Sequence, residues 1–179
     1  MQRIGSIGYL MIASDSGSKK GNGGMKIEHV VARETEPRRM YEWDNLLGVC
    51  GGVIFGPKGQ VDHCDTSKGA QKITVHPGRQ TPDPEAVFVY RNTGRVEGSI
   101  PEARVDIDIL NLNAQRLVDN RKDLIHDLHN KLRSDDGIRA IQSLYKAATT
   151  PNSEGLLPPF ALIRAQYLAK KLHARRVRP

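Results

Sequence analysis

The sequence predicts an α+β fold, in which a loop-rich first part with short strands precedes a mostly α-helical C-terminal region. Two observations predict this order. As far as about residue 104, short apolar runs alternate with turns, in a chain with 17 glycines and 10 prolines among its 179 residues. Beyond Asp106, leucine and isoleucine recur at helical spacing. We therefore divide the chain into residues 1–24, a flexible or degraded segment, residues 25–104, and residues 105–179.

The first part is expected to contain short strands and the beginning of a helix. Residues 25–29 have the pattern of a short strand. Residues 43–50 return to apolar character until two glycines interrupt them, and Val61 leads into a second short strand or a knuckle. Residues 65–68 then begin a helix, since the carboxylate of Asp65 can accept from the free N–H groups of a first helical turn.

The rest of the chain predicts a hairpin followed by helices. Residues 86–90 and 95–97 have strand character on either side of an Asn-Thr-Gly turn, which favours an antiparallel pair. Helical spacing of apolar residues then continues over residues 109–137. Two more helices are expected at residues 138–148 and 160–173, and the last of them ends in a run of lysine and arginine. That basic end could contact the phosphates of a nucleic acid. It could equally be a solvated helix end, since cations interact favourably with the dipole at a helix C-terminus.

The positive charge favours polyanionic partners, and the lack of a long apolar run argues against a membrane helix. The formal net charge is +7, which attracts phosphates but also suits a solvated basic surface. No run approaches the roughly 18 apolar residues of a membrane helix, so we expect a soluble cytoplasmic protein. Cys50 and Cys64 are the only cysteines and are better suited to ligand or thiol roles than to a disulfide scaffold. Trp43, the single tryptophan, we assign to the core rather than to a base-stacking platform.

One order of polar residues in the first part carries chemistry. Glu28 stands beside His29, Asn45 follows, and Asp65 opens a predicted helix. A histidine can take a proton from water, and carboxylates can hold a divalent cation such as Mg²⁺. Adjacent side chains of a regular strand point to opposite faces, but that constraint relaxes where a strand runs into a loop. Asn45 is then expected to hold His29, through its side-chain carbonyl or by fixing the loop backbone.

These residues belong to segments that resemble a known family. Residues 27–33, 41–50 and 63–69 are similar to the HNH endonucleases of the Septu and retron-associated anti-phage systems, the PtuB-type family. The helix-opening Cys-Asp-x-x-Lys-Gly resembles the Cys-Asn-x-x-Lys-Gly of wider HNH proteins. The likeness continues through residues 87–94 and 109–121, and covers about residues 25–133.

The resemblance implies a function and a set of residue roles. It implies a ββα-metal core with His29 as general base, Asn45 as the middle residue of the motif, and Glu28 with Asp65 as ligands of Mg²⁺ or Mn²⁺. It implies a nucleic-acid substrate, expected to be DNA, and an ATPase partner in anti-phage defence. The expected nucleic-acid contacts are Lys68 and Arg33.

The sequence also departs from that family. Many relatives have a Cys-x-x-Cys pair before the Glu-His strand, which completes a four-thiolate zinc site with later cysteines. Residues 14–24 contain no cysteine here, so Cys50 and Cys64 supply only half of such a site. His63 is a candidate third zinc ligand and His76 a fourth, although adjacent ligands at positions 63 and 64 make an awkward tetrahedron.

Two other functions therefore stay open. The first is a catalytically inactive module that binds nucleic acid and docks a partner, having lost its zinc-knuckle cysteines. The second is a small zinc-binding transcription regulator, which is disfavoured because no helix-turn-helix signature accompanies the cysteines.

Overall fold

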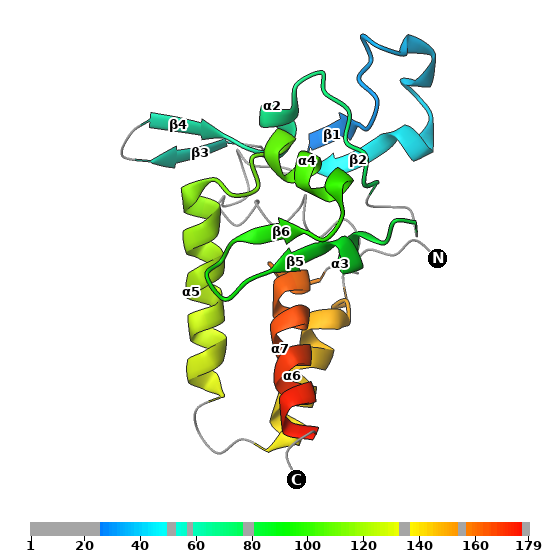
Figure 1. The fold of residues 1–179 in the computed structure, drawn as a ribbon. Coiled ribbons are helices and arrows are strands. Elements are labelled where there is room, and N and C mark those ends of the chain that lie inside the picture. Colours follow the sequence, from blue (N-terminus) through cyan, green and yellow to red (C-terminus); the bar gives the residue numbers. More distant parts are fainter. Residues whose placement is uncertain are drawn as a thin grey trace.

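The computed structural model describes residues 26–49, 53–56, 59–76, 81–132, 137–153 and 157–176. Two-stranded sheets and helices are mixed in these ranges, so the fold is α+β, as predicted. Figure 1 shows the sheets and short helices gathered toward one end, with the longer helices of the C-terminal part running to the other end. Within the described ranges, no helix combines the length and the apolar character that crossing a membrane requires.

The first hairpin contains most of the residues selected above. Two antiparallel strands and two turns of 3-10 helix form it: β1 (Lys26–His29), η3 (Pro37–Arg39), η4 (Trp43–Asn45) and β2 (Leu46–Val49). Glu28 lies opposite Leu47 in the register, and His29 lies opposite Leu46. The predicted strand is therefore confirmed, and His29 is its last residue.

A second hairpin and a short helix follow: β3 (Val53–Gly56), β4 (Gly59–Asp62) and α2 (Cys64–Lys68). The strand expected at Val61 is present, and it pairs with a preceding strand that the sequence did not predict. Figure 1 shows this hairpin projecting away from the rest of the fold. All four residues of β4 are exposed, so this strand lacks the alternation of buried and exposed residues that marks a strand packed on a core.

A third hairpin lies between two helices: α3 (Pro84–Val87), β5 (Phe88–Tyr90), β6 (Val96–Gly98) and α4 (Pro101–Ile109). The predicted hairpin is confirmed, but the first residues assigned to its leading strand form α3 instead. Asp83 caps that helix by accepting from the Glu85 backbone N–H at 3.0 Å. On the other side, the Asn113 side chain accepts from Val96 N at 2.9 Å and donates to Val96 O at 3.0 Å, which extends the pairing of β6.

The long helix predicted over residues 109–137 is wrong in its first part. The chain instead ends α4, turns, and begins α5 (Gln115–Lys131). Asn111, in the turn, has a left-handed backbone with φ of 46°, which a continuing α-helix excludes. Because Leu110 and Leu112 stay buried through the turn, the apolar spacing continued across a break in the helix. The predicted boundary after residue 104 falls within α4.

The last two helices are confirmed as α6 (Ile138–Thr149) and α7 (Ala161–Arg176). They pack on each other, and α7 also reaches β5. Gln166 accepts from Tyr90 N at 2.9 Å and donates to Phe88 O at 2.8 Å, so its amide satisfies two backbone groups at the edge of β5.

One hydrophobic cluster joins the parts of the chain on either side of residue 104. It includes Leu47 and Val49 of β2, Phe88 of β5 and Leu168 of α7. The first hairpin is therefore anchored on the same core as the helices, and this core positions the residues of the candidate site.

Candidate active site

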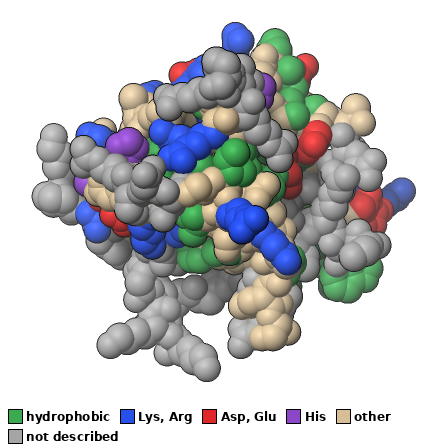
Figure 2. Space-filling model, turned by 90° about the horizontal axis from the view of Figure 1, so that it is seen from below, with side chains coloured by type: hydrophobic (Ala, Val, Ile, Leu, Met, Phe, Trp, Pro, Cys, Tyr) green, Lys and Arg blue, Asp and Glu red, His purple; other side chains and the backbone are tan. Residues whose placement is uncertain are grey.

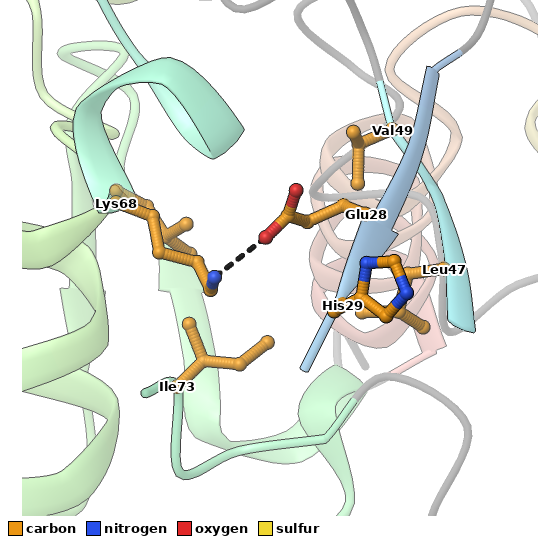
Figure 3. Close-up of a pocket in the computed structure, with 7 residues that line it drawn as sticks. Glu28, His29, Leu47, Val49, Lys68 and Ile73 are labelled. Atoms are coloured by element: carbon orange, nitrogen blue, oxygen red, sulfur yellow. Dashed lines mark hydrogen bonds and ion pairs between the residues drawn. The ribbon is translucent and has the colours of Figure 1, made fainter. Parts of the chain in front are cut away.

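The end of β1 carries the acidic residue and the histidine, and they point in different directions. The Glu28 side chain points toward α2, where Lys68 Nζ donates to Glu28 Oε1 at 2.6 Å (Figure 3). The His29 ring leaves the strand in another direction, as alternation requires, with Nε2 3.0 Å from Met40 O. A carbonyl oxygen can only accept, so Nε2 carries the hydrogen and a neutral ring keeps Nδ1 unprotonated.

Asn45 is fully buried and holds the loop between the two strands. Its Oδ1 accepts from Val31 N at 2.8 Å, and its Nδ2 donates to Val31 O at 3.2 Å and to Arg39 O at 3.0 Å. The next residue after Arg39 is Met40, and its backbone carbonyl oxygen is the one that binds the ring of His29. The sequence left two ways for Asn45 to hold His29: through its own side-chain carbonyl, or by fixing the loop backbone. The contacts of its side chain with the backbone of Val31 and Arg39 agree with the second way.

Helix α2 is placed by the end of α4. Cys64, which has a left-handed φ of 51°, donates its backbone N–H to Leu110 O at 2.7 Å. Ser67 Oγ donates to Ile109 O at 2.9 Å. Asp65 lies in the first turn of this helix, one turn before Lys68, and its side chain lies outside the described part of the structure. The predicted Mg²⁺ ligand role of Asp65 thus stays a prediction.

The two residues expected to contact nucleic acid differ in exposure. Arg33 is exposed on the loop after β1, where a phosphate can reach it. Lys68 is only 2% exposed and its ammonium is bound to Glu28, so it does not present its charge to a partner in this structure. The core assignment of Trp43 is wrong, since 86% of this residue is exposed on η4. Tyr41, two residues earlier, is 82% exposed.

Two of the described candidate zinc ligands, His63 and Cys64, lie in contact with each other. Cys50 lies outside the described residues. His63 and Cys64 are both buried, and His63 Nδ1 lies 3.3 Å from Cys64 Sγ. His76, the candidate fourth ligand, has its Nε2 3.0 Å from the backbone oxygen of Asp44. In the described ranges, no three histidine, cysteine or acidic side chains converge, and the zinc site expected from Cys50, Cys64 and His63 stays a prediction.

Asp106 is a structural residue of the site that the sequence analysis missed. It is fully buried on α4 and accepts from the backbone N–H groups of Thr74, at 2.9 Å, and Val75, at 2.7 Å. Burial raises the pKa of its carboxyl, and these two hydrogen bonds oppose that rise. The segment that it holds also contains Ile73, which faces the Glu28–Lys68 pair (Figure 3).

The sequence did contain a signal for Asp106. It shares one helical face with three apolar residues that are buried in the structure, namely Ala103, Ile107 and Leu110. An acidic residue on such a face requires a buried partner, here the backbone of residues 74 and 75.

A cavity of about 10 Å³ lies beside the pair of charges. Besides Glu28, His29 and Lys68, its lining is apolar and consists of Leu47, Val49, Ile73 and Leu110. Such a volume corresponds to roughly one water molecule. The two residues of β1 thus share one small cavity although their side chains leave the strand in different directions.

A second, larger hollow of about 190 Å³ lies at the far ends of the long helices. Three basic and three apolar residues line it: His129, Leu132, Ile141, Lys171, Ala174 and Arg175. Figure 2 views the molecule from this end and shows lysine and arginine side chains beside exposed hydrophobic ones. None of the described residues that line this hollow is acidic.

Comparisons with known proteins add no family assignment. No protein-family model matches the chain, and no curated protein matches it significantly. The resemblance to HNH endonucleases therefore depends on the sequence motifs quoted above alone.

Proposed function

We propose that this chain is a metal-dependent HNH endonuclease that hydrolyses phosphodiester bonds of nucleic acid, with DNA as the expected substrate. One observation carries the proposal. Glu28 and His29 of β1, Leu47 and Val49 of β2 and Lys68 of α2 all line one small cavity, and Asn45 holds the loop that joins the two strands. The β3–β4 hairpin lies between β2 and α2 along the chain. Two strands and a helix around one site are the elements that a ββα-metal core would need.

His29 supplies the general base in this mechanism. Its Nε2 is occupied by Met40 O at 3.0 Å, so the opposite ring nitrogen is the one that accepts the proton of an attacking water. Asn45 keeps that ring in place indirectly, since it binds the carbonyl of Arg39, next to Met40. The role of Asn45 is therefore positioning rather than proton transfer.

Glu28 and Asp65 would hold the Mg²⁺ or Mn²⁺ ion. Glu28 already binds a cation, the Lys68 ammonium at 2.6 Å, and its carboxylate oxygens are the donors that these ions prefer. The bound ion would relieve charge on the phosphoryl oxygens and on the leaving oxygen. No role in this proposal depends on zinc.

The test is Mg²⁺-dependent cleavage of plasmid DNA by the full chain, with and without any ATPase encoded beside it. His29→Ala is expected to lower the rate by about 10²–10⁴-fold, the usual contribution of a general base. His126→Ala, which removes an exposed histidine of α5, is the matched control and should cleave at the wild-type rate. Equal cleavage by both variants would contradict the assignment.

The second candidate is an inactive module that binds nucleic acid and docks a partner, and the basic hollow at the helix ends favours it. Two cationic side chains, Lys171 and Arg175, beside His129 around one concavity suit the phosphates of a polyanion. The joint change Lys171→Glu and Arg175→Glu should then weaken duplex DNA binding and reduce its salt dependence. Lys72→Glu, an exposed lysine outside the hollow, is the control. Equal affinities in fluorescence anisotropy would remove this candidate.

A further inference from the structure

Lys68 of the short helix α2 is unusual because its side chain is buried. It is 2% exposed, although lysine is rarely buried unless it is paired. Its Nζ donates to Glu28 Oε1 at 2.6 Å and to Gly69 O at 3.2 Å. In Figure 3 the ammonium and the carboxylate point at each other between α2 and β1, 40 residues apart along the chain.

The apolar surroundings of this pair strengthen the electrostatic attraction between Lys68 and Glu28. The cavity beside the pair has room for about one water, and apart from His29 the rest of its lining consists of leucine, isoleucine and valine side chains. Little solvent is present to screen the charges, so their attraction exceeds that of an exposed pair. The Glu28 side chain is only 18% exposed. A second cation must therefore displace the Lys68 ammonium or share the carboxylate with it.

We infer that Lys68 is the internal cation of this site: its ammonium holds the Glu28 carboxylate until a divalent ion competes for it, and Lys68 thereby sets the metal affinity. This inference rests on the proposed function, in which Glu28 is a metal ligand. It assigns Lys68 a positioning role on the acidic ligand, in place of the nucleic-acid contact expected from the sequence.

The expected effect of Lys68 on metal affinity can be sized from the effect of a nearby cation on proton binding to a carboxylate. An opposite charge within about 4–6 Å of a carboxylate lowers its affinity for a proton by about one to three pKa units, which is about ten- to a thousandfold. A divalent ion meets the same competitor and is also repelled by it. Removal of the ammonium should therefore raise metal affinity by about tenfold or more.

The experiment measures Mn²⁺ binding to the full chain, from the electron paramagnetic resonance signal of the free ion. Lys68→Met removes the charge and retains an apolar stem, and it should bind Mn²⁺ about tenfold more tightly or better. Lys68→Arg keeps a cation and should behave as the wild type, as should the control Lys72→Met. Tight binding to Lys68→Met should disappear when Glu28→Gln is added.

The outcomes separate this inference from the proposed function. Equal Mn²⁺ affinity of the wild type and Lys68→Met would overturn the inference and leave a metal site at Glu28. Absence of Mn²⁺ binding to both proteins would overturn the inference together with the metal-dependent function.

A measurement on the wild type keeps the inference testable if Lys68→Met does not fold. Lysine acetylation followed by mass spectrometry reports the accessibility of each ammonium. Without metal, Lys68 should react far more slowly than the exposed Lys72, and saturating Mg²⁺ should increase the rate at Lys68 severalfold. An acetylation rate at Lys68 that does not respond to Mg²⁺ would overturn the inference.

Discussion

Asn45 and Val31 bind each other twice across the loop that joins β1 to β2. Val31 N donates to Asn45 Oδ1 at 2.8 Å, and Asn45 Nδ2 donates to Val31 O at 3.2 Å. A side-chain amide thus pairs with the main chain as a neighbouring strand would. Both residues are buried, so water cannot replace either bond if the Asn45 side chain is removed.

Asn45→Ala should therefore lower the free energy of unfolding by about 2–4 kcal/mol, because it leaves buried backbone groups of Val31 without partners. Urea unfolding followed by circular dichroism measures the loss. Asn130→Ala, at an exposed position of α5, is the control and should change stability by less than about 0.5 kcal/mol. A similarly small change for Asn45→Ala would contradict the structure of the loop.

The sequence predicted the parts of the fold that depend on local pattern. Helices α6 and α7 and the β5–β6 hairpin were predicted to within a few residues, since their apolar spacing and turn residues are contiguous in the chain. The break between α4 and α5 was missed because Leu110 and Leu112 are buried through the turn itself. Residues 110–114 separate the helices there, with a left-handed backbone at Asn111 and a non-helical one at Ala114, and no periodicity of apolar residues reports these angles.

The candidate site was less predictable because its contacts are not local. The partner of Glu28 is Lys68, 40 residues away, and no spacing rule joins them. Trp43 was assigned to the core from its residue type, yet burial depends on which side of the loop faces the core. Asn45 was found because its residue type and its place between strands matched a motif.

Gly94 lies where a side chain has no room. Its φ is 83°, and a Cβ atom there would lie 2.1 Å from Val118 O and 2.9 Å from Lys122 N, both backbone atoms of α5. Gly94→Ala should cost about 2–5 kcal/mol in thermal or urea unfolding, from backbone strain and overpacking together. Gly69→Ala is a matched control, with φ of 54° and open space around the added atom.

The control isolates the steric contact between the β5–β6 turn and α5. Gly69→Ala carries only the cost of a left-handed backbone, about 1–2 kcal/mol. If the two variants lost equal stability, the close approach of Gly94 to α5 would be wrong.

Asp106 should give the protein a measurable pH dependence. Burial raises its folded-state pKa above the usual 3.8, so the folded protein retains the proton to higher pH than the unfolded chain does. The contribution of Asp106 is therefore fully present below about pH 4 and decreases as pH rises through the folded-state pKa. An asparagine side chain does not titrate, so the stability difference between wild type and Asp106→Asn should decrease as pH rises from about 4.

Urea unfolding at several pH values checks this sign. Asp108→Asn, which removes an exposed carboxylate from the same helix, controls for the change in net charge on α4. A difference between wild type and Asp106→Asn that grows with pH would mean that the hydrogen bonds from Thr74 and Val75 to the ionised carboxylate outweigh its burial.

Trp43 is the single tryptophan of the chain, so its fluorescence reports this one position. With 86% of the residue exposed, acrylamide should quench the folded protein nearly as well as it quenches the urea-unfolded chain. The emission maximum should also move little on unfolding, while the circular dichroism changes fully. Trp43→Phe should change the free energy of unfolding by less than about 0.5 kcal/mol, because few buried contacts are lost. Protected, blue-shifted emission together with a loss of several kcal/mol would instead place this side chain in the core and reverse the orientation of η4.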